Sequence, residues 1–216
     1  MITILYDVVN IYIQARFMYN REDKIVNRGT YMKELDVILA DLHLEQNIQW
    51  DDIPNIDLYM DQVIQLFENT YSGSKRNEKE KILTKTMINN YAKGKLFFPI
   101  NKKKYSKEHI ILISLIYQLK GALSMNDIKA TLHSINEKVL TEELQLDKFY
   151  NSYLNLYNQN ANKFRDEIKA REKEVKAEVA CLDNNHPEEL EKTLLIASLV
   201  NTSNMYRRAA EKLIDE

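Results

Sequence analysis

Apolar side chains recur at helical spacing along most of the chain from Met32 onward, and this pattern predicts a succession of amphipathic helices. Residues 32–45 are the first of these, with apolar positions at Leu35, Ile38, Leu39 and Leu42. The sequence "IQWDDIPNID" then interrupts the pattern, because Pro54 disfavours a helical conformation at the residue before it. Asp57 can cap the next helix, which carries Met60, Val63, Ile64 and Phe67 on one face.

The sequence "LTKTMINNYAKGKLFFP", residues 83–99, predicts a short helix that follows a polar loop at residues 69–80. Thr84 is expected to be its N-cap, since a threonine hydroxyl can accept a hydrogen bond from the first turn of a helix. Met87, Ile88 and Tyr91 then face inward, and the positions between them are polar.

The sequence "FFPINKKKYS" is expected to be short, extended and basic, and it leads to a strongly apolar helix capped by Ser106. The apolar stripe of that helix is interpreted as core; it comprises Ile110, Ile113, Ile116 and Tyr117. Gly121 is expected to end the helix. Ser124 and Asp127 resemble a capping box and predict the start of another helix.

Beyond residue 140 the pattern predicts two longer helical stretches and a last helix. The first stretch has an apolar stripe at Leu146, Phe149, Tyr153 and Leu156. The second has a stripe at Phe164, Ile168, Val175, Val179 and Leu182. The sequence "DNNHP" interrupts the second stretch, and the last helix is expected from Glu188 to Ile214.

Composition agrees with an all-α fold. The chain has 216 residues, of which 44% are hydrophobic and 29% are charged, and it contains only 4 Gly and 3 Pro. We expect a helical domain at residues 32–140 and a helical dimerisation or effector region at residues 141–216. Residues 1–31 are interpreted as a poorly structured extension or an annotation artefact, because the codons before Met32 can contain a purine-rich tract of the kind that precedes a start codon.

The net charge of −2 conceals two segments of opposite charge. Residues 32–70 contain nine acidic residues and one basic residue, a local charge of −8. Residues 75–107 contain eleven basic and two acidic residues, a local charge of +9. A basic segment of this strength is typical of proteins that bind a polyanion, although the two segments can also neutralise each other within the fold.

Other function classes lack their sequence signals. No glycine-rich phosphate loop occurs, and the four histidines and Cys181 form no zinc-binding pattern, so we expect no catalytic residues, no metal and no cofactor. The single cysteine is compatible with the cytoplasm. The longest apolar run, residues 109–119, is far shorter than the roughly 20 residues that span a bilayer.

Three segments together resemble a known family: "DLYMDQVIQLF", "LTKTMINNYAKGKL" and "KKKYSKEHI". They are similar to the bacterial domain-of-unknown-function family 1836, which is regarded as MerR-like, and the resemblance covers residues 48–135. It implies a MerR-like winged helix-turn-helix domain followed by long C-terminal helices. The sequence departs from the family pattern at the turn glycine, which lies at Gly94 and leaves Lys95 in its place.

The resemblance also implies which residues contact DNA. The helix at residues 84–93 would enter the major groove with Lys85, Thr86, Asn89 and Asn90 outward and Tyr91 at its end. The basic loop would place Lys102, Lys103, Lys104 and Tyr105 on phosphate. Independently of the family, asparagine can pair with adenine and lysine neutralises phosphate.

Two functions follow as hypotheses. The first is a cytoplasmic, DNA-binding regulator of transcription that binds double-stranded DNA as a homodimer, with an unknown effector. The alternative is a non-enzymatic helical interaction module that uses the same fold without DNA. The apolar stripe on residues 164–182 is expected to form the dimer interface, unless the last helix covers that stripe within one chain.

Overall fold

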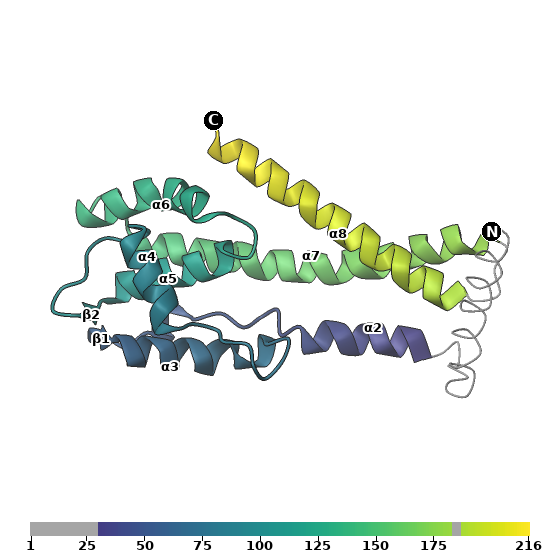
Figure 1. Cartoon of the computed structure of the whole chain (residues 1–216), viewed down its shortest axis with the longest axis horizontal. Helices are drawn as coiled ribbons and strands as arrows, with labels where there is room; N and C mark the ends of the chain where they lie inside the picture. Colours follow the sequence, from purple (N-terminus) through teal and green to yellow (C-terminus); the bar gives the residue numbers. More distant parts are fainter. Residues whose placement is uncertain (1–29, 183–186) are drawn as a thin grey trace, which may run out of the picture. The chain divides into compact units, whose positions relative to one another are not determined.

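The computed structural model describes residues 30–182 and 187–216, and Figure 1 shows their order along the chain. Its helices and strands are α2 (Thr30–Asp41), η1 (Trp50–Asp52), β1 (Leu58–Tyr59), α3 (Met60–Tyr71), η2 (Ser72–Ser74), α4 (Lys85–Lys93), β2 (Lys104–Tyr105), α5 (Lys107–Leu119), α6 (Met125–Leu140), α7 (Leu146–Ala180) and α8 (Pro187–Ile214). The chain divides after Ala40 into two units, so every element from η1 onward belongs to the second unit. Residues 1–29 of the expected N-terminal extension (residues 1–31) lie outside the described residues.

The first helix is shorter than expected. The prediction of a helix over residues 32–45 is wrong at its end, because α2 stops at Asp41. His43 has a φ of 47°, which is incompatible with a continuing right-handed helix, and its carbonyl accepts a hydrogen bond from the N–H of Gln46 at 3.1 Å.

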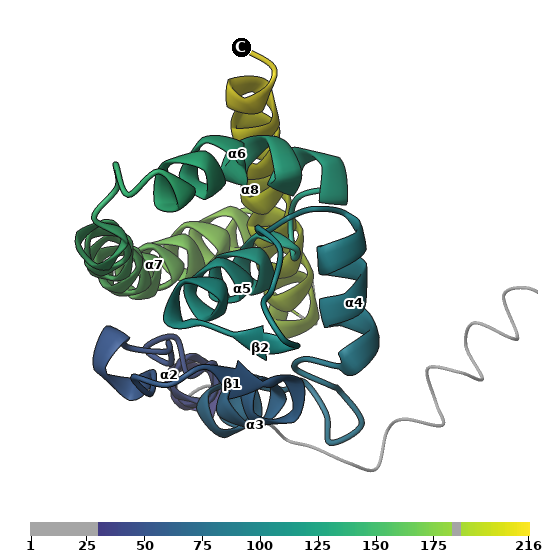
Figure 2. The same ribbon diagram turned by 90° about the vertical axis from the view of Figure 1, so that its left-hand side faces the viewer.

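Helix α5 lies at the centre of the second unit. Figure 2 shows it in the middle, with α3, α4, α6 and α7 around it. Every residue from His109 to Ile116 is buried, which explains why this stretch is apolar on all sides rather than on one face. The expected core residues Ile110, Ile113 and Ile116 are fully buried, and Tyr117 packs against the core.

Buried hydroxyl groups join three of these helices. The Oγ of Ser114 on α5 lies 3.4 Å from the hydroxyl of Tyr71 on α3 and 3.2 Å from the hydroxyl of Tyr150 on α7. The Tyr150 hydroxyl donates a hydrogen bond of 2.7 Å to the carbonyl of Ile48. Each hydroxyl therefore has a partner in the core, which offsets the cost of removing it from water.

A two-stranded antiparallel sheet closes one end of the domain. Leu58 of β1 pairs with Tyr105 of β2, and Tyr59 pairs with Lys104. This pairing corrects the expected helix start, because β1 holds residues 58–59 extended and α3 is capped at Tyr59 rather than at Asp57. The basic segment before Ser106 is extended as expected, and it forms the second strand.

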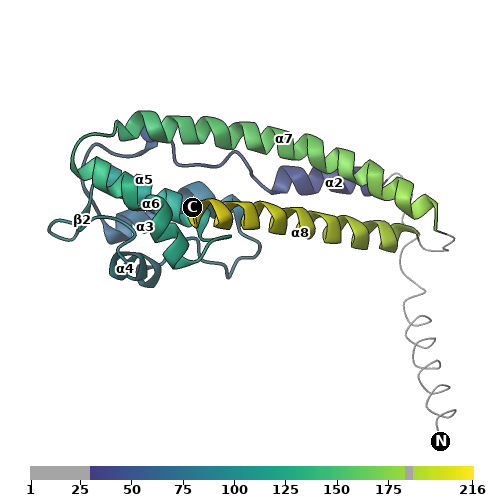
Figure 3. The same cartoon turned by 90° about the horizontal axis from the view of Figure 1, so that it is seen from above.

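Helix α7 is one continuous helix. The prediction of two separate stretches between residues 146 and 182 is wrong, because neither Gly nor Pro occurs between Leu146 and Ala180 to interrupt the helix. Figures 1 and 3 show α8 running back along α7. The last helix, expected from Glu188 to Ile214, is confirmed as α8.

The apolar stripe on α7 is partly covered within the chain. Val175 and Val179 are buried with Leu195 of α8. This is the arrangement expected if the last helix, rather than a second chain, covers the stripe. Phe164 and Leu182 of the same stripe keep 37% and 53% of their surface exposed. The part of the stripe near the end of α7 therefore belongs to the packing between α7 and α8.

Candidate nucleic-acid interface

Helix α4 has a buried side and a polar outer side. Thr84 is its N-cap, as expected, and the Thr84 Oγ1 accepts a hydrogen bond of 3.2 Å from the N–H of Met87. Ile88 and Tyr91 are buried, while Thr86, Asn89 and Asn90 are exposed. The helical period of 3.6 residues sets these three on the side opposite the core.

One residue of this outer side was missing from the predicted set. Lys93 is exposed and lies seven residues after Thr86, so two turns of helix place the two side chains on the same face. No acidic partner of Lys93 occurs among the residues described. The seven-residue spacing from Thr86 is visible in the sequence and is the signal that identifies it.

Lys85 lies at the edge of the outer face. Its Nζ forms an ion pair of 2.8 Å with Oδ1 of Asp61 on α3, and both side chains are mostly exposed. The pair reduces the charge that Lys85 offers to a phosphate, and an exposed pair of this kind contributes little to stability. We therefore expect Lys85 to contribute less to phosphate binding than Lys93.

The end of α4 places another lysine in an unusual conformation. Gly94 has a right-handed conformation, with a φ of −70°, whereas Lys95 has a φ of 56°. The N–H of Leu96 closes the helix end with a 3.0 Å hydrogen bond to the carbonyl of Tyr91. Lys95 thus occupies the left-handed position that glycine usually takes after a helix.

The basic loop contains a tight turn at residues 101–104. The N–H of Lys104 donates a 2.9 Å hydrogen bond to the carbonyl of Asn101, and the two central residues, Lys102 and Lys103, have φ values of 48° and 61°. Positive φ at both central positions is the pattern of a type I′ turn. Both lysines are exposed, and Figure 1 shows the loop before β2 projecting at the end of the domain.

Aromatic rings lie beneath Lys104, the last residue of the turn, and beneath Lys107. The Nζ of Lys104 lies 5.2 Å from the centre of the Tyr59 ring, and the Nζ of Lys107 lies 4.1 Å from the centre of the Trp50 ring. A cation over an aromatic ring is attracted to its negative face. These two charges are therefore positioned beside the sheet, whereas Lys102 and Lys103 extend from the turn.

The two tyrosines of the predicted set are not surface contacts. Tyr91 is 4% exposed and Tyr105 is 1% exposed, so neither side chain can reach DNA in this structure. Burial raises the pKa of Tyr91 to about 12. Burial also raises the pKa of Tyr105. The prediction that these side chains contact DNA is therefore wrong, and both belong to the core beneath the interface.

A buried histidine fixes the base of the turn. The N–H of Ser106 donates a 3.2 Å hydrogen bond to Nδ1 of His109, so Nε2 carries the proton and donates to the carbonyl of Phe98, also at 3.2 Å. The rings of Phe98 and His109 have centres 4.0 Å apart. His109 thus joins both ends of the basic loop to α5.

The stability of the domain is expected to fall as the pH drops below the ordinary histidine pKa of 6.5. Burial lowers the pKa of His109, so the unfolded chain binds its proton before the folded chain does. The contribution of neutral His109 is complete above pH 6.5 and is lost as the pH falls through the folded pKa. Denaturant unfolding at about pH 7.5 and about pH 5 should show a smaller pH effect in His109→Gln than in wild type. His133→Gln is the control: it loses only an exposed pair with Glu137, which contributes little, and it should show nearly the wild-type pH effect.

The acidic and basic segments neutralise each other only in part. Lys75 pairs with Glu68, and Lys85 pairs with Asp61. The lysines of the α4 end and the turn are exposed and have no acidic partner among the described residues; they are Lys93, Lys95, Lys102 and Lys103. A positively charged surface therefore remains around α4 and the turn.

Other kinds of site find no support in the described part of the chain. No group of three or more His, Cys, Asp or Glu side chains within residues 30–182 and 187–216 is arranged to hold a metal ion. Nor does any helix in these ranges combine the length and the apolar character that crossing a membrane requires.

Comparisons with known proteins bear on the same region. Neither the curated proteins nor the solved structures contain a match to this chain. The expected resemblance to family 1836 is confirmed by a family model, and the matched segment includes α4, the turn and α5. Residues 48–153 match the family described as Domain of unknown function (DUF1836).

Proposed function

We propose that this protein is a cytoplasmic regulator of transcription that binds double-stranded DNA through α4 and the turn at residues 101–104. In this proposal the domain is a MerR-like winged helix-turn-helix. The observation that carries it is the outer face of α4, where Thr86, Asn89, Asn90 and Lys93 are all exposed over a buried inner face. A helix with this division is suited to the major groove, which admits one α-helix.

The side chains of this face have the chemistry that base recognition requires. The side-chain amide of asparagine can donate a hydrogen bond to N7 of adenine and accept one from its N6 amino group, and a threonine can contact a base edge or a thymine methyl group. Lysine contributes affinity without sequence preference by neutralising phosphate. Asn89 and Asn90 would therefore provide specificity, and Lys93 would hold the helix against the backbone of the groove.

The conformation of the turn supports a role for its charges. A left-handed conformation costs a non-glycine residue roughly 1–2 kcal/mol, and type I′ turns strongly favour Asn-Gly at their two centres. Lys102 and Lys103 occupy these centres instead, with φ values of 48° and 61°. Two lysines at such positions do not stabilise the turn. Their presence therefore favours a function for their charges.

We also propose that the protein is a homodimer through the C-terminal helices. Several apolar side chains of α8 are exposed in the single chain, among them Leu194, Ile196, Val200 and Met205. Ile196 and Val200 are one turn apart and each exposes more than half of its surface. Exposed apolar side chains at this spacing are suited to pack against a second helix.

Replacement of Asn89 or Asn90 by alanine is expected to reduce the preference for a specific site. If the side chain pairs with adenine, the loss is about 1–3 kcal/mol at that site, with little change on random DNA. The salt dependence should stay the same, because no charge is removed. Competition between specific and random duplexes measures the effect.

Thr84→Ala is the matched control on the same helix. It removes the N-cap hydrogen bond to Met87, so it should lower the stability of the domain by about 1 kcal/mol without changing sequence preference. If Thr84→Ala alters preference as much as Asn89→Ala does, the asparagines act through the helix rather than through the bases.

The function as a whole is tested by titrating the wild-type protein with a mixed-sequence duplex at several salt concentrations. We expect binding at low salt that weakens steeply as salt increases. Absence of binding at low salt would contradict the proposal. The alternative would then be favoured, in which the same basic surface binds an acidic protein partner.

A further inference from the structure

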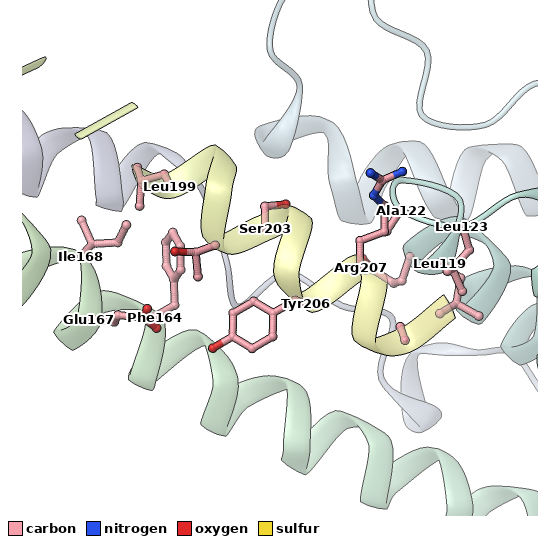
Figure 4. Close-up of a pocket in the computed structure, with 13 residues that line it drawn as sticks. Leu119, Ala122, Leu123, Phe164, Glu167, Ile168, Leu199, Ser203, Tyr206 and Arg207 are labelled. Atoms are coloured by element: carbon pink, nitrogen blue, oxygen red, sulfur yellow. The ribbon is translucent and has the colours of Figure 1, made fainter. Parts of the chain in front are cut away.

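An apolar pocket lies between the end of α5 and the two C-terminal helices, away from the proposed DNA-binding surface. Its volume is about 560 Å³, and its walls come from the turn between α5 and α6, from α7 and from α8. Figure 4 shows Phe164 and Ile168 of α7 on one side and Leu199 and Tyr206 of α8 on the other. Leu119 and Leu123 close the end next to α5. Pockets that bind small organic molecules have volumes of about 300–1,000 Å³.

The charged groups of the pocket are already paired along their own helices. Oε1 of Glu167 lies 3.7 Å from Nη2 of Arg171, and Nη1 of Arg207 lies 3.6 Å from Oε1 of Glu211. Glu167 and Arg207 also carry opposite charges, so the lining has no net charge. A charged ligand would lose hydration without gaining an unpaired counter-ion, which favours a neutral ligand.

A few uncharged polar groups are available. Ser203 lines the pocket, and its hydroxyl has no hydrogen-bond partner among the described residues. Gln118 also lines it, at the end of α5, and its Nε2 is held by Oδ1 of Asn47 at 3.2 Å. A predominantly apolar wall with a small number of hydrogen-bonding groups is the usual composition of a small-molecule site.

The half of α8 above the pocket has few buried side chains. Leu195 is buried against α7, but no residue after it in α8 is fully buried, and Tyr206, which lines the pocket, is 67% exposed. The first half of the helix is therefore anchored to α7, and the second half borders the pocket and contacts α6. A ligand in the pocket would add apolar contacts to the α8 side chains that line it, chiefly Leu199 and Tyr206.

We propose that this pocket binds a neutral, mainly apolar small molecule with one or two hydrogen-bonding groups, and that the bound molecule fastens the second half of α8 to α5 and α7. Binding requires no DNA, so the proposal is independent of the function proposed above. The size of the pocket, its balanced charges and its mainly apolar lining all favour this class of ligand.

N-phenyl-1-naphthylamine, a neutral fluorescent apolar compound, is a suitable probe. We expect saturable binding of one probe molecule per chain to the full-length wild-type protein. In Ser203→Trp the indole would occupy the pocket, so binding should weaken by about tenfold or more, which corresponds to a loss of at least about 1.4 kcal/mol. Asn201→Trp adds the same side chain at an exposed position of α8 that does not line the pocket, and it should bind as wild type does.

Hydrogen exchange gives a second test that needs no variant. Saturation with the probe should slow amide exchange in residues 200–214 more than in residues 187–196, because the second half of α8 gains contacts. Absence of saturable binding would overturn the proposal. So would equal binding by wild type and Ser203→Trp, equal weakening in both tryptophan variants, or unchanged exchange in residues 200–214 at saturation.

Discussion

Replacing both Lys102 and Lys103 by alanine is expected to weaken binding to every duplex, specific and random alike. If each lysine neutralises one phosphate, the slope of log K against log salt should decrease by roughly two units, and affinity at about 0.1 M salt should fall by about 60-fold. Alanine is as unfavourable as lysine in a left-handed conformation, so the turn itself should change little. Binding isotherms at several salt concentrations measure both quantities.

The control for this pair removes the same charge elsewhere. Lys192 and Lys212 are exposed on α8, and replacing both by alanine changes the net charge of the protein equally. This variant should keep nearly the full salt slope, because its lysines lie on the C-terminal helix rather than on the proposed interface. Equal losses in the two double variants would show that only the overall charge matters, and would remove the turn from the mechanism.

The double variant Ile196→Glu and Val200→Glu is expected to convert a dimer into a monomer while leaving each chain folded. These side chains are 53% and 55% exposed in the single chain, so glutamate costs little there. In a dimer interface the same two carboxylates would lose hydration without a partner, which should weaken association by about a hundredfold or more. Sedimentation equilibrium distinguishes the two states, and a monomeric wild type would contradict the dimer.

Val175→Glu is the informative contrast to this variant. Val175 is 7% exposed and packs with Val179 and Leu195, so a glutamate there would place an unpaired carboxylate between α7 and α8. We expect a loss of about 3 kcal/mol or more in stability, seen as a lower denaturation midpoint. If Val175→Glu became monomeric and the double variant at Ile196 and Val200 did not, the result would therefore reflect damage to the chain rather than the location of the interface.

The sequence by itself was sufficient for features that depend on neighbours along the chain. Thr84 and Ser124 were expected to cap α4 and α6, and both do, since a cap needs only a hydroxyl within reach of the first turn. The apolar stripe of α5 was likewise interpreted as core, because burial removes its apolar run from water.

Tertiary structure decided the features that depend on which element packs over a residue. Helical spacing indicated that Tyr91 faces inward, whereas the family resemblance implied a DNA contact for it, and the packing of the core decided between the two. Tyrosine is apolar along its ring and polar at its end, so its sequence position did not show that Tyr105 is buried. The pairing of Lys85 with Asp61 depended on the packing of α3 beside α4. The covering of Val175 by α8 instead of by a second chain was left open by the apolar pattern, because periodicity identifies an apolar face but not the surface that covers it.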